Sequence, residues 1–259
     1  MKIGVGITTY NQEDYFKTLY DSLPLDKIDE LVVVNGGDKY KGDYDCDWIQ
    51  HNKNRYPSVC RNDCITFLTN KDCGHIFLLE DDIIIKDENV FDEYIRISEN
   101  TGVKYFSFVS MSRECGQPNN RNPAAEIHYN ADTEIVLYNH MCNEFTYHHV
   151  SCFEKTGLYD SNLRDAFDLD LVYRHSLKEH GTPFWWFPDL PDSDKYLMNN
   201  PEAKSRLQSD DREDGLSRNK MLPKTVEYFT KKHGTWINGV PKATLEHVKY
   251  RLKQIHDMK

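Results

Sequence analysis

The chain has 259 residues, of which 39% are hydrophobic and 12% are aromatic. This composition supplies enough apolar surface for a substantial core, which excludes disorder throughout, and the length fits one large domain or one domain with an appendage. No apolar run approaches the roughly 20 residues of a membrane-spanning helix. The first residues, MKIGVGITTY, lack the order of a signal peptide, so we expect a cytoplasmic protein, in the host cytoplasm if the source is viral.

The formal net charge of −10 is unevenly distributed along the chain. Residues 215–259 hold ten Lys or Arg against three Asp or Glu, a charge of +7, which leaves −17 on residues 1–214. A basic segment of this kind suits contact with a polyanion, although a solvated helical face is the commoner meaning of the pattern. The seven cysteines lack the paired spacing of a zinc site, which favours free thiols.

Apolar runs and helical spacings alternate through the first third of the chain. The expected elements are strands over residues 3–9, 29–35 and 75–79, a short strand around Trp48 and Ile49, and helices over residues 12–23 and 59–68. This alternation predicts an α/β fold with a mostly parallel, Rossmann-like sheet and helices on both of its faces.

Polar side chains follow each of the three main strands. They lie at residues 8–11, 35–38 and 80–82. Because ligands of such sheets bind beyond the carboxyl ends of the strands, we expect these three clusters to meet at one edge, where a nucleotide with a metal on its phosphates would fit. Neither a Gly-x-Gly-x-x-Gly fingerprint nor a Walker-type lysine loop is present.

The acidic triplet Glu80, Asp81 and Asp82 directly follows the third strand. Side chains alternate in an extended chain, so Glu80 and Asp82 share one side of the strand end. Carboxylate oxygens suit Mg²⁺ or Mn²⁺, ions that complete their shells with water and substrate phosphates. The other interpretation of the triplet is a solvated turn after a strand.

Four motifs in order carry a resemblance to a known family. They are ITTYNQ at the first strand, VVVNGGD at the second, NKNRYPSVCRNDCITFL before the third and LLEDD at its end. This set resembles the family 2 glycosyltransferases of the GT-A fold. The resemblance implies a nucleotide-sugar donor, such as a UDP-sugar, with Mn²⁺ or Mg²⁺ at Glu80 and Asp82. Glu80 stands where the first Asp of the family's Asp-x-Asp motif is usual.

The resemblance also implies a set of residues that bind the donor. These are Thr8, Tyr10, Asn11, Asn35, Asp38, Arg61, Asn62 and Asp81. Asn35 replaces a usual Asp, which leaves recognition of the nucleotide base open.

Motifs in the second half extend the resemblance to roughly residue 190. FEKTGLYD, residues 153–160, is similar to a turn of the family, and AFDLDLVYRHSLKEHG resembles its base helix. Asp168 falls on the position of the general base, which implies inversion at the anomeric carbon. Without the resemblance, an acid in the first turn of a helix is explained by the helix dipole alone. Asp170 and Arg174 lie four residues apart and can pair on one helical face.

A third metal ligand is the least determined part of the expected site. Many GT-A enzymes take it from a His after the strand that follows the base helix, but DLPDSDK follows PFWWFP here. Asp194, His233 or water could fill the position. Residues 111–130 show little periodicity, and we expect a flexible loop there.

The end of the chain predicts a polar linker and two basic helices. We divide the chain into a core, residues 1–199, and a tail, residues 200–259; within the core, residues 1–85 form the nucleotide-binding half and residues 86–199 the acceptor half. LPKTVEYFTKKHG and PKATLEHVKYRLKQIH predict the helices.

The acceptor is left open by the sequence, with a glycan, a protein or a modified DNA base as candidates. The basic tail favours DNA, as in a phage-type transferase acting on hydroxymethylated pyrimidines, whereas the acidic core opposes it. A nucleotidyltransferase and a non-catalytic sugar-binding or partner-binding protein of the same fold are the alternatives from other classes.

Overall fold

The structure is a computed structural model, and it describes residues 1–109, 123–139, 143–164, 167–180, 186–202, 218–236, 239–240 and 242–259. The first part of the chain forms β1 (Lys2–Thr9), α1 (Glu13–Ser22), the 3-10 helix η1 (Leu25–Lys27), β2 (Glu30–Asn35), β3 (Asp47–Gln50), α2 (Pro57–Asn70), β4 (Cys73–Glu80), β5 (Ile83–Ile85) and α3 (Val90–Thr101). These bounds confirm the strands and helices predicted up to residue 80.

The rest of the chain adds shorter strands and the remaining helices. They are β6 (Tyr105–Ser107), β7 (Ala125–Asn130), β8 (Thr133–Tyr138), β9 (Phe145–His149), α4 (Ser151–Thr156), α5 (Phe167–His180), β10 (Phe187–Asp189), the 3-10 helix η3 (Ser193–Lys195), β11 (Leu197–Asn199), α6 (Arg218–His233) and α7 (Leu245–Asp257). None of the described helices is long and apolar enough to cross a membrane.

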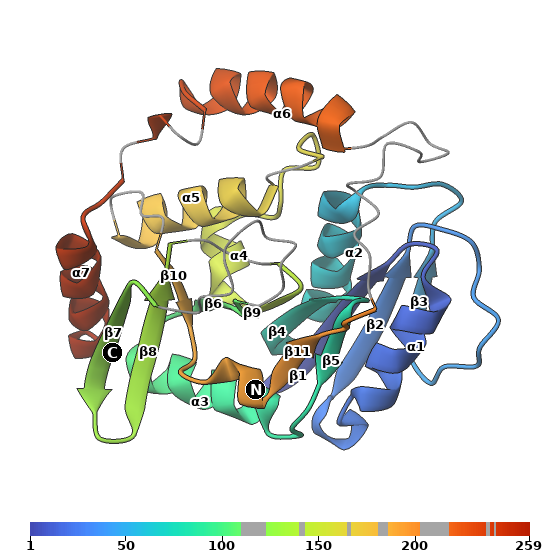
Figure 1. Ribbon diagram of the computed structural model, residues 1–259, viewed down its shortest axis with the longest axis horizontal. Coiled ribbons are helices and arrows are strands. Elements are labelled where there is room, and N and C mark those ends of the chain that lie inside the picture. The colour runs from blue at the N-terminus through green and yellow to red at the C-terminus, as the bar shows by residue number, and fades with distance from the viewer. Residues whose placement is uncertain are drawn as a thin grey trace.

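A six-stranded sheet in the order β3-β2-β1-β4-β9-β6 lies at the centre of the molecule (Figure 1). β1 pairs in parallel with β2 and β4, and β2 pairs in parallel with β3, whereas β9 is antiparallel to β4 and to β6. The mainly parallel α/β architecture predicted from the sequence is confirmed. The parallel register places Thr8 opposite Glu80 and Thr9 opposite Asn35, so the three polar clusters do share one edge.

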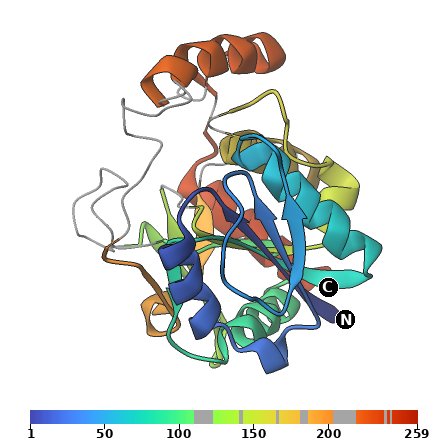
Figure 2. The same ribbon diagram turned by 90° about the vertical axis from the view of Figure 1, so that its right-hand side faces the viewer.

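Alternating strand residues bury two different faces of this sheet. Val5 and Ile7 of β1 belong to the cluster that includes residues of α1 and α3, and Val32 and Val34 of β2 belong to the cluster beneath α2. Figure 2 shows α1, in dark blue, and α2, in cyan, on opposite sides of the strands. Strands buried on both faces need continuous apolar runs, which is why VVV and IFLL mark them in the sequence.

Two small antiparallel sheets complete the fold, in the orders β10-β8-β7 and β11-β5. The loop predicted over residues 111–130 is therefore wrong for residues 125–130, because β7 pairs with β8 and buries alternate side chains such as Ile127. Residues 110–122 lie outside the described part of the chain. Pairing of β11 with β5 brings the backbone N–H of Asn200 to the carbonyl oxygen of Asp82, at 2.6 Å.

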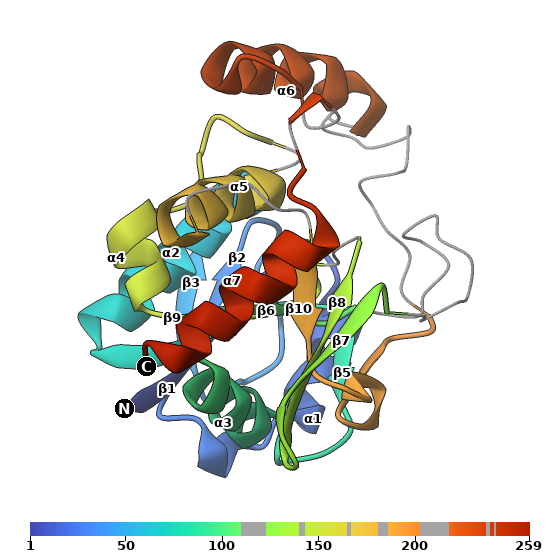
Figure 3. The same cartoon turned by 90° about the vertical axis from the view of Figure 1, so that its left-hand side faces the viewer.

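The two predicted C-terminal helices form and pack on the preceding residues. Figure 3 shows α7 beside α3 and β7, and α6 on the outer side of α5. Val248 and Leu252 of α7 are buried in the same cluster as β1, and Phe229 of α6 is buried in the cluster of α2. The division of the chain at residue 199 stays a prediction.

Candidate active site

Asp81 is buried, directly after the end of β4. Thr9 Oγ1 donates a hydrogen bond to Asp81 Oδ2, at 2.6 Å, and Gln12 Nε2 donates to Oδ1, at 3.3 Å. Burial raises the pKa of Asp81 to about 7, because desolvation penalises the charged carboxylate more than these donors stabilise it. Through its hydrogen bond with Thr9, Asp81 therefore links the polar cluster of residues 80–82 to the cluster of residues 8–11.

The charged form of the Asp82 carboxylate is disfavoured by its surroundings. Its Oδ1 is buried and has no hydrogen-bond partner among the described residues. Burial, followed by the neighbouring charges of Glu80 and Glu144, raises its pKa far above the ordinary 3.8. A divalent cation would relieve this repulsion and supply the missing partner, so these carboxylates fit an oxygen-liganded Mn²⁺ or Mg²⁺.

Glu144 was not among the residues expected from the sequence. It lies just before β9, where its backbone carbonyl accepts the N–H of Glu80 at 2.9 Å. Like charges opposite one another on paired strands destabilise a sheet. The antiparallel pairing of β4 with β9 that creates this proximity is decided by tertiary structure and leaves no local mark in the sequence.

Arg61 of α2 lies at the centre of the charged site. Its side chain is 0% exposed, and its guanidinium donates to Glu80 Oε1 at 2.9 Å and to Asp168 Oδ1 at 3.1 Å. Nη2 also donates to the carbonyl of Asn143, at 2.5 Å. Burial alone would lower the pKa of Arg61, but the charges of Asp168 and Glu80 raise it above its ordinary value, so the residue stays charged.

The expected contact of Arg61 with the donor stays a prediction. The Arg61 side chain has no exposed surface, and its guanidinium holds two carboxylates, those of Glu80 and Asp168. Asp168 lies in the first turn of α5 and is only 4% exposed, whereas the Glu80 side chain keeps 35% of its surface exposed. Arg61 thus joins the predicted metal motif to the predicted base, 107 residues away along the chain.

Some of the expected donor-binding residues lie at the carboxyl edge of the central sheet, and others make hydrogen bonds that hold the loops at this edge. Thr8 and Tyr10 are half-buried at the end of β1. Asn35 is fully buried and bonds within its own loop, where its Oδ1 accepts from Gly37 N at 2.8 Å and its Nδ2 donates to the Asp38 carbonyl at 2.7 Å.

Two further members of the set hold backbone segments in place. Asn11, with φ of 54°, accepts the N–H of exposed Asp38 at 2.6 Å and so ties the first loop to the second. Asn62 makes two 2.9 Å hydrogen bonds with the backbone of Tyr159, in the turn that precedes α5. Direct contact of any of these side chains with a donor stays a prediction.

Asp194 and His233 were expected as possible third metal ligands. Among the contacts of the described residues, none links either of them to Asp82. Asp194 is exposed in η3, and His233 Nε2 instead bonds with Asp170 Oδ1, at 2.7 Å. The predicted pair of Asp170 with Arg174 is confirmed at 2.8 Å.

A separate group of ligand atoms, from Glu126, His128 and Glu134, lies on the β7–β8 hairpin and could hold a metal ion. The first two of these residues are exposed, and exposed acids commonly gather without an ion.

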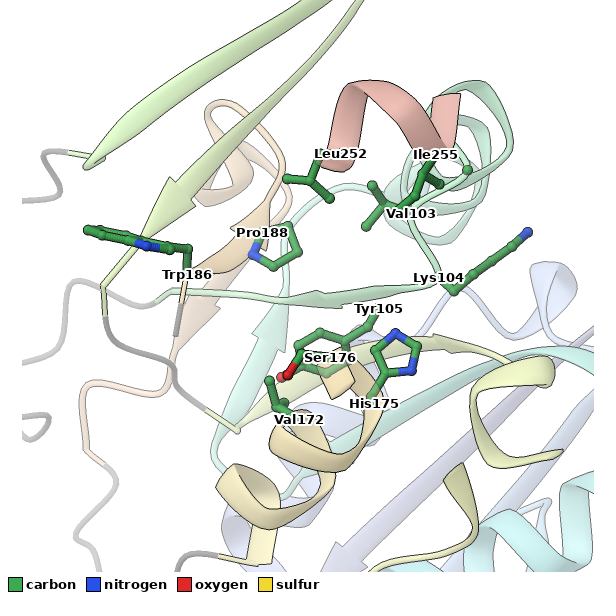
Figure 4. A pocket seen from close by; sticks show the side chains of 11 residues that line it. Val103, Lys104, Tyr105, Val172, His175, Ser176, Trp186, Pro188, Leu252 and Ile255 are labelled. Atoms are coloured by element: carbon green, nitrogen blue, oxygen red, sulfur yellow. The ribbon is translucent and has the colours of Figure 1, made fainter. Parts of the chain in front are cut away.

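Figure 4 shows a pocket between α5, α7, β6 and β10, whose free space, counted with the solvent at its open side, is about 510 Å³. Its walls are mainly apolar and include Val103, Tyr105, Val172, Trp186 and Leu252. The residues that line it include none of the acids described above. We therefore place the candidate active site at the carboxyl edge of β1 and β4, where the charges meet.

Comparison with known proteins gives the fold an independent test. No protein-family model matches the sequence. An uncharacterized glycosyltransferase of Acanthamoeba polyphaga mimivirus is 29% identical over 127 residues, which cover 42% of this chain and 48% of that protein. The match thus spans about half the length of this curated relative.

Solved structures with a similar fold cover almost the whole chain. The mannosyltransferase PcManGT of Pyrobaculum calidifontis, in complex with GDP-Man and Mn²⁺, matches 99% of this chain and 73% of its own with a TM-score of 0.57 and 12% identity. S. aureus TarS 1–349 in complex with UDP matches 96% of this chain and 77% of its own, with a TM-score of 0.53 and 13% identity. The match to a longer TarS chain covers 95% of this chain and 46% of the TarS chain.

These likenesses establish the class of protein by its fold. The chain has the GT-A-like fold of these glycosyltransferase structures, as its motifs predicted.

Proposed function

We propose that the protein is a glycosyltransferase that moves a hexosyl or pentosyl group from a nucleotide sugar to an acceptor hydroxyl. The observation that carries the proposal is the buried Arg61, which joins Glu80 of the acidic motif to Asp168 of α5. Two carboxylates suited to different tasks are thereby held in one site at the carboxyl edge of the sheet, where ligands of such folds bind. The fold shared with glycosyltransferases supports the same activity.

Glu80 and Asp82 are the residues that would hold Mn²⁺ or Mg²⁺. A bound cation stabilises the negative charge that develops on a departing nucleoside diphosphate. The buried Oδ1 of Asp82, which has no hydrogen-bond partner in the described part of the chain, supports this role, as does the exposed part of Glu80. The PcManGT structure holds Mn²⁺ with its GDP-Man, which supports the choice of ion.

Asp168 is the proposed general base. An opposite charge favours the ionised form of a carboxylate, and Arg61 supplies that charge at 3.1 Å. The ionised Asp168 accepts the proton of the acceptor hydroxyl as the hydroxyl oxygen attacks the anomeric carbon. Attack from the face opposite the diphosphate inverts the anomeric configuration.

The first experiment is a thermal-shift panel with UDP, GDP, CDP, dTDP and their sugars, each with and without Mn²⁺. A ligand that binds only the folded protein raises its Tm, so the proposal expects a shift for one nucleotide that requires the metal. Asp82→Asn should remove this shift, and Asp26→Asn, at an exposed position in η1, should keep it. Absence of a shift with all the ligands would contradict a nucleotide-sugar donor.

Release of free sugar from the identified donor separates the enzyme classes. A glycosyltransferase should hydrolyse its donor slowly in the presence of Mn²⁺ and release a nucleoside diphosphate. A nucleotidyltransferase would instead release pyrophosphate from a nucleoside triphosphate, and a non-catalytic binding protein would release nothing.

A polyanionic acceptor such as hydroxymethylated DNA is a second proposal, favoured by the exposed basic residues of the tail. They include Lys224, Lys231, Lys242 and Lys253. Binding through phosphate contacts weakens steeply with salt. The triple variant Lys231→Glu, Lys242→Glu, Lys253→Glu should lose DNA affinity at low salt; unchanged affinity would leave a glycan or protein as the acceptor.

A further inference from the structure

A second polar cluster lies on the opposite side of the first turn of α5. Asp170 is fully buried, and the side chains of Arg174, Lys232 and His233 surround it. Arg174 Nε lies 2.8 Å from its Oδ2, and Lys232 Nζ and His233 Nε2 lie 2.8 Å and 2.7 Å from its Oδ1. Lys232 and His233 come from the last turn of α6, so the cluster joins two helices that are far apart in the sequence.

The same cluster also holds the turn that precedes α5. Arg174 donates to the carbonyls of Thr156 and Leu158, at 2.5 Å and 2.8 Å. Lys232 donates to Asp160 Oδ2 at 2.6 Å. Between these anchors lies Tyr159, whose ring faces Arg61, with the guanidinium 5.9 Å from the ring centroid. The end of α6, the turn and the base helix thus form one connected set of polar contacts.

The helix geometry gives this connection a direction. Two residues along an α-helix differ by about 200° in direction, so Asp168 and Asp170 point to opposite sides of α5. Asp168 meets Arg61 on the side of the sheet, and Asp170 meets α6 on the outer side, where Figure 1 shows α6 running along α5. The first turn of α5 is therefore held from both sides, which fixes its rotation about the helix axis.

We propose that Lys232 and His233 of α6 are positioning residues that act through Asp170 to hold the proposed base, Asp168, in its reactive orientation. This inference rests on the proposed function. Replacing a buried ion pair by apolar residues often leaves stability unchanged, so stability alone is a weak reason for a chain to bury the Asp170 carboxylate here. Orientation matters far more, because a displacement of about 1 Å at a reacting group can cost a factor of about 100 in rate.

The test measures kcat, KM and donor Kd for His233→Ala, Lys232→Met and the wild type, with the identified donor and acceptor. We expect kcat per folded molecule to fall about 10-fold to 100-fold in both variants, because the base is misplaced, while donor Kd changes less than about twofold. His233→Gln, which can still donate a hydrogen bond to Asp170, should recover most of the activity. Glu227→Ala, at an exposed position of the same helix, should behave as the wild type.

Further measurements separate positioning from a purely structural role. In a double-mutant cycle, Asp170→Asn should abolish most of the additional effect of His233→Ala on kcat, since both changes break the same contact. A lower Tm with unchanged kcat in His233→Ala and Lys232→Met would overturn the inference and show that the cluster contributes only to stability.

Failure of the proposed function would look different. A wild-type protein without transferase activity, or a fully active Asp168→Asn variant, would refute the base itself and the inference with it. If Asp168→Asn is inactive and His233→Ala is fully active, only the positioning role is refuted.

Discussion

At the residue scale, the site depends on one buried arginine and the carboxylates it holds. A charged side chain is costly to bury unless it is paired, and Arg61 is paired with Glu80, Asp168 and a carbonyl. The guanidinium has a planar fork of donors that a lysine lacks, so it can hold two carboxylates from different elements at once. Arg61 thus holds the two carboxylates from within the core, and the Glu80 side chain keeps part of its surface exposed.

Replacement of the proposed base gives the most direct test of the mechanism. Asp168→Asn keeps the volume and one oxygen for Arg61 but cannot accept a proton. We expect transfer to fall by a factor of about 10² to 10⁴ while donor binding is retained. Single-turnover transfer and donor titration on the same preparation check both parts, and a variant with wild-type transfer would exclude Asp168 as the base.

The raised pKa of Asp82 predicts a pH dependence of the metal-free protein. Because this pKa lies above the ordinary 3.8, the folded chain binds a proton that the unfolded chain releases, and stability falls as pH rises above about 4. In EDTA at pH 8, Asp82→Asn should raise the Tm by about 2–4 °C, the shift that about 1 kcal/mol gives in a chain of this size.

When Mn²⁺ is present, Asp82→Asn should instead lower the Tm relative to the wild type. Mn²⁺ should raise the Tm of the wild type and leave that of Asp82→Asn unchanged. Equal stabilisation of both proteins by Mn²⁺ would show that the ion binds elsewhere, for example at Glu126, His128 and Glu134 on the β7–β8 hairpin.

At the scale of elements, α2 reaches β1 closely enough to place Arg61 only because glycine lies beneath it. A Cβ atom on Gly6 would lie 2.6 Å from Cys64 Cβ, and one on Gly4 would lie 2.8 Å from Leu68 Cδ2. The Leu68 methyl group could turn aside, but the Cys64 Cβ is fixed to the helix backbone, so a Cβ on Gly6 would require α2 to move. Cys64 and Leu68 are fully buried along this contact, so the small residues of IGVGITT set the depth of α2.

Gly6→Ala should therefore destabilise the protein and displace α2. Overpacking of a core costs about 1–3 kcal/mol, which urea unfolding would show as a lower midpoint. Gly36→Ala is the matched control, because its added Cβ would meet Tyr10 at 3.6 Å, an ordinary contact. Equal midpoints for the two variants would contradict the close approach of α2 to β1.

At the scale of the whole molecule, the C-terminal helices contribute buried residues to the hydrophobic core. Leu252 of α7 is 2% exposed and lies in the same cluster as strands β1 and β4. Its replacement by Ala should cost about 2–5 kcal/mol of unfolding free energy. Lys253→Ala, on the exposed face of α7, should change stability by less than about 0.5 kcal/mol.

Chemical denaturation with a probe in the N-terminal half checks this prediction. If Leu252→Ala lowers the midpoint for the N-terminal probe as well, α7 and the sheet unfold together. A variant whose N-terminal transition is unchanged would make the tail an independent unit, as the division at residue 199 supposes.

The sequence by itself determined the α/β class, the order of elements up to residue 80 and the position of the acidic motif. These features depend on local patterns. Buried parallel strands need runs of apolar residues, and amphipathic helices need apolar residues spaced three or four apart, so both can be recognised in a short stretch of sequence. The spacing of Val90, Phe91, Tyr94 and Ile97 and the alternation in β7 are local patterns of the same kind for α3 and the hairpin.

Only the tertiary structure decided what those residues do together. Arg61 lies 19 residues from Glu80 and 107 from Asp168, and Asp170 lies 63 from His233, so no local pattern could show these contacts. Their existence depends on how deeply α2 packs, where β9 inserts beside β4, and how α6 returns over α5. A buried charge is stable only where its partners converge, and that convergence is a property of the packed chain.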